Sequence, residues 1–204
     1  QTVTVTVTDI GPTVISSPST ANFVEGGTGT VLDVDAASEA AITYAITGGV
    51  DAAQFAINAT TGVLTFITPP DADIPGDVGA NNVYDVQVTA STVASGTAVQ
   101  NIAITVTGAN DNDPVITSSA TASFAENALG TVIDVNATDA DVPAQTLTFS
   151  ITGGADAARF AINATTGIVT FVASPNFEAP TDVGADNVYN LQVTASDGTR
   201  TTAQ

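Results

Sequence analysis

The sequence predicts an all-β protein of two tandem seven-stranded antiparallel Greek-key β-sandwiches, the second of which lacks most of its last strand. Valine and threonine alternate with period two, which is typical of strands that bury one face. An internal repeat recurs after about 100 residues, which is the size of one globular domain. Turn-forming Gly, Asn, Asp and Pro recur about every ten residues, and no segment has helical periodicity of useful length.

The two repeats align over most of their length. The segment 55–62 is identical in sequence to 160–167, and 84–90 closely matches 189–195. We therefore expect two domains with the same fold. The expected divisions are a strand of a neighbouring repeat at 1–11, domain 1 at 12–108, a connector at 109–113 and domain 2 at 114–204.

The alternating runs of the first repeat predict its strands in order. Between two of the shorter strands, Gly62 and its counterpart Gly167 supply the positive φ that a tight turn needs. We expect strands near 13–16 with 22–24, 30–36, 41–47, 54–57, 63–67, 83–91 and 98–107.

Residues 1–8 alternate Thr and Val in the same way as residues 100–107, so they correspond to the last strand of a domain. In the second repeat, residues 199–204 align only with the start of that strand, which predicts an open slot in domain 2. Two interpretations remain. Strand 1–8 of one copy fills the slot of the next copy, head to tail, as a filament of separate chains. Alternatively, one covalent array of repeats runs through the same position.

The composition excludes several classes of function. The chain has 21 acidic and two basic residues and a net charge of −19, so binding to nucleic acid or to an anionic membrane surface is not expected. No stretch approaches the about 20 apolar residues of a membrane span. The chain has no Cys, His or Met, which removes disulfides and the commonest transition-metal ligands and general bases. The carboxylates either form a solvated surface or hold hard cations such as Ca²⁺.

Five motifs together resemble the cadherin repeat, specifically the tandem cadherin-like domains of large bacterial surface and secreted adhesins. They are a Glu near the first strand, an acidic motif after the fifth strand, a Tyr-x-Leu/Val-x-Val-x-Ala strand, an Asn-Asp-Asn-x-Pro connector and an Asp-x-Asp motif in the second repeat. The resemblance covers residues 12–204. It implies extracellular, cell-surface adhesion modules with three Ca²⁺ ions between consecutive domains.

The resemblance also implies which residues would bind calcium. Domain 1 would contribute Glu25, Asp71 and Asp73. The connector and domain 2 would contribute Asn110, Asp111, Asn112, Asp139, Asp141 and Asp197. So many carboxylates would repel one another without a cation among them.

The chain departs from the family pattern at both joints. At the central joint, Gly108 stands where the family has Asp, and the acidic motif ends in the shorter Asp73, so one ion is expected to be weak or missing. Asp113 is expected to point to solvent. At the first joint, residues 8–12 lack the Asn-Asp-Asn motif, residues 38–40 read Ser-Glu-Ala, and Thr92 replaces Asp197. We expect no full calcium cluster there.

The sequence therefore predicts a calcium-rigidified structural or adhesive module of an extracellular fibre or a large surface adhesin, with Ca²⁺ as its cofactor. Identical repeats or subunits, head to tail, are the expected partners, with other cell-surface proteins or polysaccharide as further ones. The alternative is a polysaccharide-binding adhesin segment, although Tyr44, Tyr84 and Tyr189 occupy inward strand positions. No nucleophile elbow or phosphate loop is present, so we do not expect an enzyme.

Overall fold

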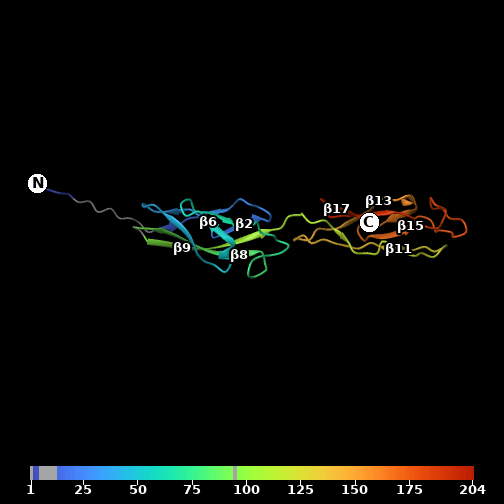
Figure 1. The fold of residues 1–204 in the computed structure, drawn as a ribbon, viewed down its shortest axis with the longest axis horizontal. Helices are drawn as coiled ribbons and strands as arrows, with labels where there is room; N and C mark the ends of the chain where they lie inside the picture. The colour runs from blue at the N-terminus through green and yellow to red at the C-terminus, as the bar shows by residue number, and fades with distance from the viewer. Residues whose placement is uncertain (1, 5–12, 94–95) are drawn as a thin grey trace. The chain divides into compact units, whose positions relative to one another are not determined.

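The structure is a computed structural model that describes residues 2–4, 13–93 and 96–204. It divides into two compact units, unit 1 at Gln1–Ala109 and unit 2 at Asn110–Gln204. Both units are built from strands, and their only helical elements in the described residues are two short 3₁₀ turns (Figure 1). The all-β prediction is therefore confirmed.

Unit 1 forms its strands where apolar and polar residues alternate. The 3₁₀ turn η1 (Ala52–Gln54) precedes β6. The strands are β1 (Val14–Ile15), β2 (Thr20–Val24), β3 (Thr30–Asp33), β4 (Ala36–Ala37), β5 (Thr43–Gly48), β6 (Phe55–Ile57), β7 (Val63–Phe66), β8 (Val83–Thr92) and β9 (Gly96–Thr107).

The strands of unit 1 form a four-stranded sheet in the order β2-β9-β8-β5, a three-stranded sheet in the order β3-β7-β6, and the small pair β1-β4. Most pairs are antiparallel, as predicted, but β2 and β9 are parallel. The expected strand 30–36 is interrupted, so that β3 pairs with β7 and β4 pairs with β1. The first segment, 13–24, is likewise divided, since β1 belongs to the small pair and β2 to the four-stranded sheet.

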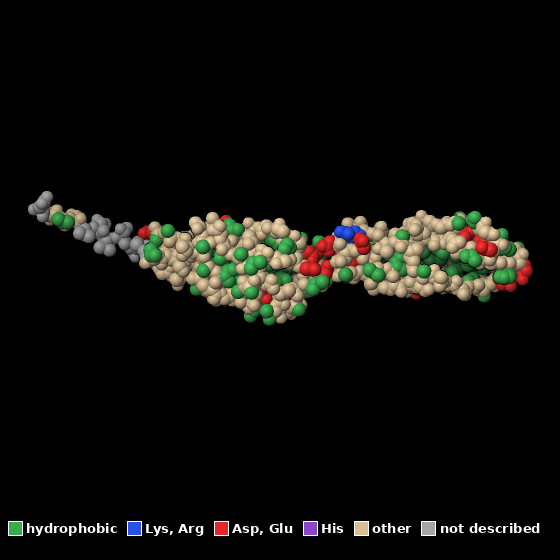
Figure 2. All heavy atoms as spheres, in the orientation of Figure 1, with side chains coloured by type: hydrophobic (Ala, Val, Ile, Leu, Met, Phe, Trp, Pro, Cys, Tyr) green, Lys and Arg blue, Asp and Glu red, His purple; other side chains and the backbone are tan. Residues whose placement is uncertain are grey.

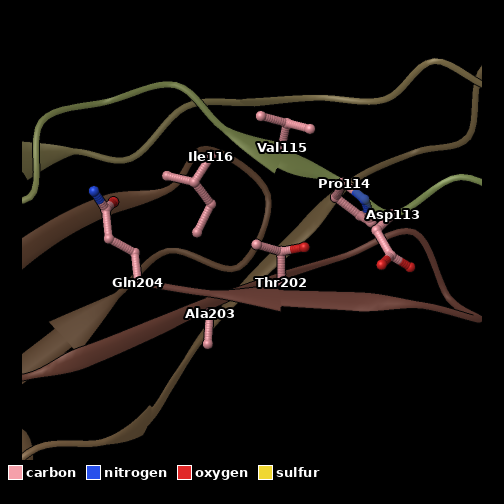
Figure 3. A pocket seen from close by; sticks show the side chains of 7 residues that line it. All are labelled: Asp113, Pro114, Val115, Ile116, Thr202, Ala203 and Gln204. Atoms are coloured by element: carbon pink, nitrogen blue, oxygen red, sulfur yellow. The ribbon is translucent and has the colours of Figure 1, made fainter.

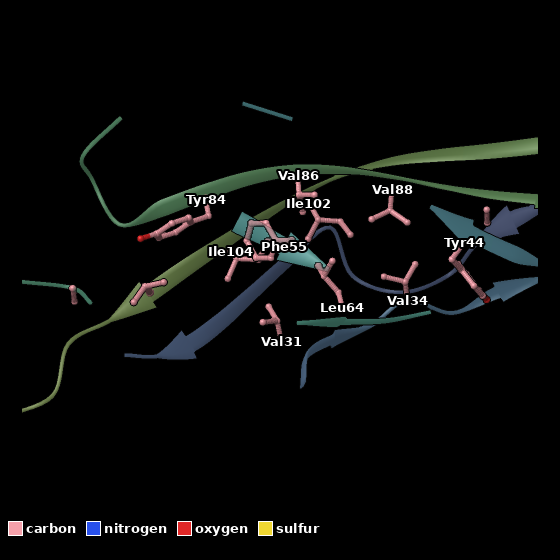
Figure 4. Packing of buried hydrophobic residues seen from close by; sticks show 13 residues of the cluster. Val31, Val34, Tyr44, Phe55, Leu64, Tyr84, Val86, Val88, Ile102 and Ile104 are labelled. Carbon is pink, nitrogen blue, oxygen red and sulfur yellow. The ribbon is translucent and has the colours of Figure 1, made fainter. Parts of the chain in front are cut away.

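The core of unit 1 lies between the two larger sheets. Val86, Val88 and Ile102 of the four-stranded sheet point toward Leu64 and Val34, and all five side chains are at most 1% exposed (Figure 4). Period-two alternation along β8 and β9 places every second residue in this layer. Burying each such aliphatic side chain contributes about 1.5–3 kcal/mol.

Unit 2 repeats this arrangement, but its last two strands are shorter than β8 and β9, and residues 121–125, which correspond to β2, are not in a strand. The 3₁₀ turn η2 (Ala157–Arg159) precedes β14. The strands are β10 (Val115–Ile116), β11 (Thr131–Asp134), β12 (Ala137–Thr138), β13 (Thr148–Gly153), β14 (Phe160–Ile162), β15 (Ile168–Phe171), β16 (Gln192–Ser196) and β17 (Thr201–Ala203).

The sheets of unit 2 are β13-β16-β17, β11-β15-β14 and the pair β10-β12, all antiparallel. The strand β17 corresponds to the start of β9, as predicted, and Gln204 continues the ladder by two backbone hydrogen bonds of 2.9 Å with Val193. A small pocket of about 320 Å³ lies between β10 and β17, where Ile116 and Gln204 line it (Figure 3).

The predicted turn glycines are confirmed. Gly62 has φ +79° and Gly167 has φ +74°, and a Cβ atom on Gly62 would lie 2.2 Å from the carbonyl oxygen of Val34. In the same turn, the side-chain Oδ1 of Asn58 accepts backbone hydrogen bonds from Thr60 and Thr61. The predicted strand 1–8 and the first joint lie almost wholly outside the described residues. Residues 2–4 are described and are not in a strand, and Val3 is 83% exposed.

Candidate metal site

Three aspartates of unit 2 lie close together although they are distant in sequence. Asp139 and Asp141 follow β12, and Asp197 follows β16. One carboxylate oxygen from each lies within 4.8 Å of the others. Asp141 is 2% exposed and Asp197 is 8% exposed, so the cluster is largely shielded from solvent. The predicted ligands Asp139, Asp141 and Asp197 are thus brought together by the fold.

Each of these carboxylates uses one oxygen to hold the backbone in place. Asp141 Oδ1 accepts hydrogen bonds from the amides of Asp111 at 3.2 Å and Asn112 at 2.9 Å, and from the Asn112 side chain at 2.9 Å. Asp139 Oδ1 accepts a bond from the Asp141 amide. Asp197 Oδ1 accepts bonds from two amides in the 198–200 turn. The start of unit 2 is therefore fixed to this cluster.

The other oxygen of each carboxylate has no hydrogen-bond partner in the described part of the chain. Asp139 Oδ2, Asp141 Oδ2 and Asp197 Oδ2 are buried and accept no hydrogen bond from the described residues, and the same is true of the carbonyl oxygen Oδ1 of Asn110. Buried polar atoms are rarely left without a partner, because removing them from water is costly. Carboxylate and amide oxygens are the ligands that Ca²⁺ takes, so the residues present fit a calcium ion.

Two of the aspartates are held in their charged form. Burial alone would raise the pKa of Asp141, but hydrogen bonds from the side chain and amide of Asn112 and the amide of Asp111 bring that pKa below its ordinary value. Burial also acts to raise the pKa of Asp197, and the amides of Arg200 and Thr199 and the Asn110 side chain lower it overall. Charged carboxylates in a shielded cluster favour a cation.

Two further connector residues have different roles. Asn112 donates hydrogen bonds from its side chain to Asp141 and to Asp111 Oδ1, so its amide group orients the cluster. Asp113 is exposed, as predicted, and forms a 3.2 Å ion pair with Arg200, the side chains being 63% and 42% exposed. Such an exposed pair contributes about 0–1 kcal/mol.

Within unit 1, the predicted ligands lie near the end of β9. Glu25 is 8% exposed and accepts hydrogen bonds from the amides of Ala72, at 2.6 Å, and Ala109. Asp71 Oδ1 accepts bonds from the amides of Asp73 and Ile74, so that Asp71 shapes the turn that carries Asp73. Glu25 thus joins the acidic motif to the last residue of unit 1.

At the end of unit 1 that carries Ser38 and Thr92, the backbone is arranged as it is around the aspartate cluster of unit 2, but the side chains differ. Ser38 Oγ accepts the amide of Ala40, just as Asp139 accepts the amide of Asp141. Thr92, the counterpart of Asp197, lies with its hydroxyl 3.5 Å from that of Thr13. Of the residues described at this end, Ser38, Ala40 and Thr92 stand where unit 2 has its three aspartates. The prediction of no full cluster there stays a prediction, because residues 5–12 lie outside the described part.

Two pairs of buried aspartates were not singled out by the sequence reasoning. Asp51, 3% exposed, accepts the amides of Val78 and Asp85, each at 2.8 Å, and its counterpart Asp156 does the same in unit 2. Asp77 accepts the amides of Asn81 and Asn82. Their recurrence at equivalent positions of both repeats was the available signal. In unit 1 these residues support the loop before β8, and in unit 2 they support the loop before β16.

No helix among the described residues is long and apolar enough to cross a membrane. The sequence model of the family described as "Cadherin domain" matches residues 120–204. Halomucin of Haloquadratum walsbyi is 41% identical over 80 residues, which cover 38% of this chain and 1% of halomucin. Human protocadherin Fat 4 is 31% identical over 153 residues, which cover 72% of this chain and 3% of Fat 4.

The fold of most of the chain is also found in solved structures. The crystal structure of human protocadherin-24 EC1-2, form II, is similar with a TM-score of 0.70 and 19% identity, over 93% of this chain and 92% of that chain. At this identity the likeness shows the fold alone. The chain spans only 1 to 6% of the length of the curated relatives that it matches.

Proposed function

For this cadherin-like chain, with a cadherin domain at residues 120–204, we propose the function of a calcium-rigidified structural and adhesive module. The module acts outside the cell, at the cell surface, as part of an extracellular fibre or a long surface adhesin. Its role is to bind and to hold a shape, and it performs no catalysis. Identical repeats or subunits are its partners, arranged head to tail.

The observation that carries the proposal is that four buried oxygens of the predicted ligands in unit 2 have no hydrogen-bond partner among the described residues. All four belong to residues that the cadherin resemblance identifies as ligands, namely Asp139, Asp141, Asp197 and Asn110. A Ca²⁺ ion takes six to eight oxygen ligands at about 2.3–2.6 Å and tolerates irregular geometry, which suits such a set. Bound calcium supplies positive charge that neutralises the cluster.

The proposal extends to Glu25, Asp71, Asp73, Asp111 and Asn112, as the resemblance implies. Glu25 holds the amide of Ala109, and the connector residues follow Ala109 directly in the sequence. A calcium ion restrains the backbone of the connector when it binds residues on both sides of Ala109 in the sequence. Without the ion, the carboxylates repel one another and the connector gains conformational freedom.

The polysaccharide-binding alternative is not favoured by the positions of two of the three tyrosines. Tyr44 is 8% exposed and Tyr84 is 2% exposed, so neither offers a free aromatic face to a sugar, whereas Tyr189 is half-buried. A glycan array with and without Ca²⁺ separates the two functions, because a structural module gives no sugar-dependent signal.

To test the calcium site, the three aspartates of unit 2 are replaced by the side chains that unit 1 has at the equivalent positions, Ser38, Ala40 and Thr92. The triple variant Asp139→Ser, Asp141→Ala and Asp197→Thr should lose calcium binding measured by titration calorimetry. Small-angle scattering of this variant in calcium should match that of the unmodified chain in EDTA, with a broader distribution of shapes in both. Asp33→Ala, on an exposed position of β3, is the control and should leave both measurements unchanged.

Two outcomes would refute the proposal. The first is calcium binding by the triple variant with the stoichiometry and affinity of the unmodified chain. The second is a scattering profile of the unmodified chain that is identical in calcium and in EDTA, since the ion would then restrain nothing. Asp111→Ala should resemble EDTA treatment if the connector itself binds the ion.

A further inference from the structure

Three Asn-Ala-Thr motifs occur in the chain, beginning at Asn58, Asn136 and Asn163. In an exported protein the sequence Asn-x-Thr is the acceptor motif for an N-linked glycan. A match to so short a motif is insufficient by itself, because the asparagine can have another role in the fold. The surroundings of each asparagine therefore decide which of the three motifs can accept a glycan.

Asn58 and Asn163 occupy the same turn in the two units. The turn joins β6 to β7 in unit 1 and β14 to β15 in unit 2. In each turn the asparagine and the three residues after it are exposed. Backbone hydrogen bonds of 2.9 Å join Asn58 to Gly62 and to Val63, and the same two bonds close the turn at Asn163. Both motifs therefore lie at the exposed tip of a hairpin.

The two ends of the asparagine side chain have separate roles in this turn. Asn58 Oδ1 accepts the amides of Thr60 at 2.9 Å and Thr61 at 3.0 Å, and Asn163 Oδ1 accepts the equivalent amides at 2.9 and 3.1 Å. Neither Nδ2 donates a hydrogen bond within the described part of the chain. An N-linked glycan is attached to Nδ2 and leaves Oδ1 in place, so the turn keeps its hydrogen bonds after modification.

Transfer of a glycan exchanges one bond at Nδ2. Nδ2 forms a bond to C1 of the first sugar of a lipid-linked oligosaccharide, and the bond from C1 to the phosphate oxygen of the carrier breaks. The polyprenyl phosphate or pyrophosphate leaves with the electron pair, and Nδ2 gives one proton to a base of the transferase. Negative charge then develops on the asparagine Oδ1, where the two amide donors of the turn stabilise it.

Asn136 has a different environment. Its Nδ2 donates a hydrogen bond to the carbonyl oxygen of Asp134 at 3.2 Å, and its own carbonyl oxygen accepts the amide of Thr117 at 2.8 Å. The next two residues form β12, which is paired with β10. Asn136 Oδ1 accepts no hydrogen bond from the described residues. This asparagine therefore lacks both the free nitrogen and the two amide donors of the turns.

Charge separates the three motifs in the same way. The hairpins 55–66 and 160–171 contain no charged residue, whereas Asn136 lies between Asp134 and Asp139. Figure 2 shows that most of the visible surface of each unit is uncharged and that acidic side chains gather at a few places. A lipid-linked donor carries an anionic phosphate, which carboxylates beside the acceptor repel. The two hairpin turns are therefore the favoured acceptors.

We propose that Asn58 and Asn163 are acceptor sites for N-linked glycans and that Asn136 is not. Each unit then carries one glycan, on a turn that contains none of the predicted calcium ligands. The inference rests on the extracellular location in the proposed function, because the donor is used on exported chains. It does not depend on calcium, so glycan transfer can fail while calcium binding holds, and the reverse.

The test is glycan transfer to the purified 204-residue chain by an oligosaccharyltransferase that recognises Asn-x-Thr, with a lipid-linked oligosaccharide as donor. Intact mass spectrometry should show two added glycans, and peptide mapping should place them on Asn58 and Asn163. Asn58→Asp keeps an acceptor oxygen for the amides of Thr60 and Thr61 but has no Nδ2, so this variant should fold and accept one glycan. Asn136→Asp should still accept two.

Two neighbouring threonines provide a matched pair of variants at exposed positions. Thr60→Val removes the hydroxyl that the motif requires and should abolish transfer to Asn58. Thr61→Val leaves the motif intact and should leave transfer unchanged. The proposal is overturned by absence of transfer to Asn58 and Asn163, by equal transfer to Asn136, or by transfer to Asn58 that survives Thr60→Val.

Discussion

Replacing Asp51 by Asn should destabilise unit 1 through the loss of one buried hydrogen bond. The two carboxylate oxygens of Asp51 accept the amides of Val78 and Asp85, each at 2.8 Å, at a position that is 3% exposed. A carboxamide of the same shape has a single acceptor oxygen. Its NH₂ group therefore faces one of the two amides, and two donors meet without an acceptor between them.

The magnitude follows from those two contacts. A buried donor left without a partner costs about 1–3 kcal/mol, and the remaining bond loses the benefit of a charged acceptor, so we expect a loss of about 2–4 kcal/mol. For a domain of this size each kcal/mol corresponds to about 4–8 °C in Tm. Since unit 2 has its own Asp156 with the same two contacts, its stability should not change.

Native-state hydrogen exchange followed by peptide-level mass spectrometry measures both units in one sample. Protection of β8 and β5 should fall in the variant, while protection of β16 and β13 serves as the internal reference. Asp33→Asn, at an exposed position of β3, is the matched control with the same change of charge. A loss below about 0.5 kcal/mol, or one equal to that of the control, would refute the hydrogen-bond argument.

Two further predictions concern the turns and the response to acid. Gly62→Ala should cost unit 1 about 1–3 kcal/mol or more in urea unfolding, because the new Cβ meets the Val34 carbonyl at positive φ, whereas Gly29→Ala has open space and should cost little. Burial would raise the pKa of Asp182, but the amides of Asp186 and Asn187 lower it overall, so its stabilising effect is complete above about pH 4 and is lost as the pH falls through the lowered pKa. Asp182→Asn should therefore reduce stability at neutral pH and flatten the acid branch of the stability curve, and an unchanged acid branch would contradict this assignment.

The sequence predicted the fold well where the signal is local. Alternation along 83–91 and 98–107 reports which face of a strand is buried, and the turn glycine Gly62 reports a backbone angle that few other residues adopt. Both features depend on neighbouring residues. The parallel pairing of β2 with β9 was not predicted, because it depends on which distant strand lies alongside, and alternation carries no information on that.

The candidate site was predictable for a different reason. Asp139, Asp141 and Asp197 were inferred from a family motif, and the structure brings them within 4.8 Å of one another. The motif does not show that one oxygen of each carboxylate accepts hydrogen bonds from amides while the other has no partner among the described residues. Which oxygen accepts a hydrogen bond depends on amides such as those of Asp111 and Asn112, whose directions are set by the folded backbone.

The parallel pairing of β2 with β9 has a mechanical consequence for a module that bears tension. These strands lie near the beginning and the end of unit 1 and run side by side in the same direction over the residues 20–24. Opposite forces on the two ends of the unit shear this pair, so its hydrogen bonds carry the load together instead of opening one after another. The pairs of unit 2 among the described residues are antiparallel, including the ladder that joins β17 and Gln204 to β16. Under tension unit 1 is therefore expected to open at this pair in one cooperative step.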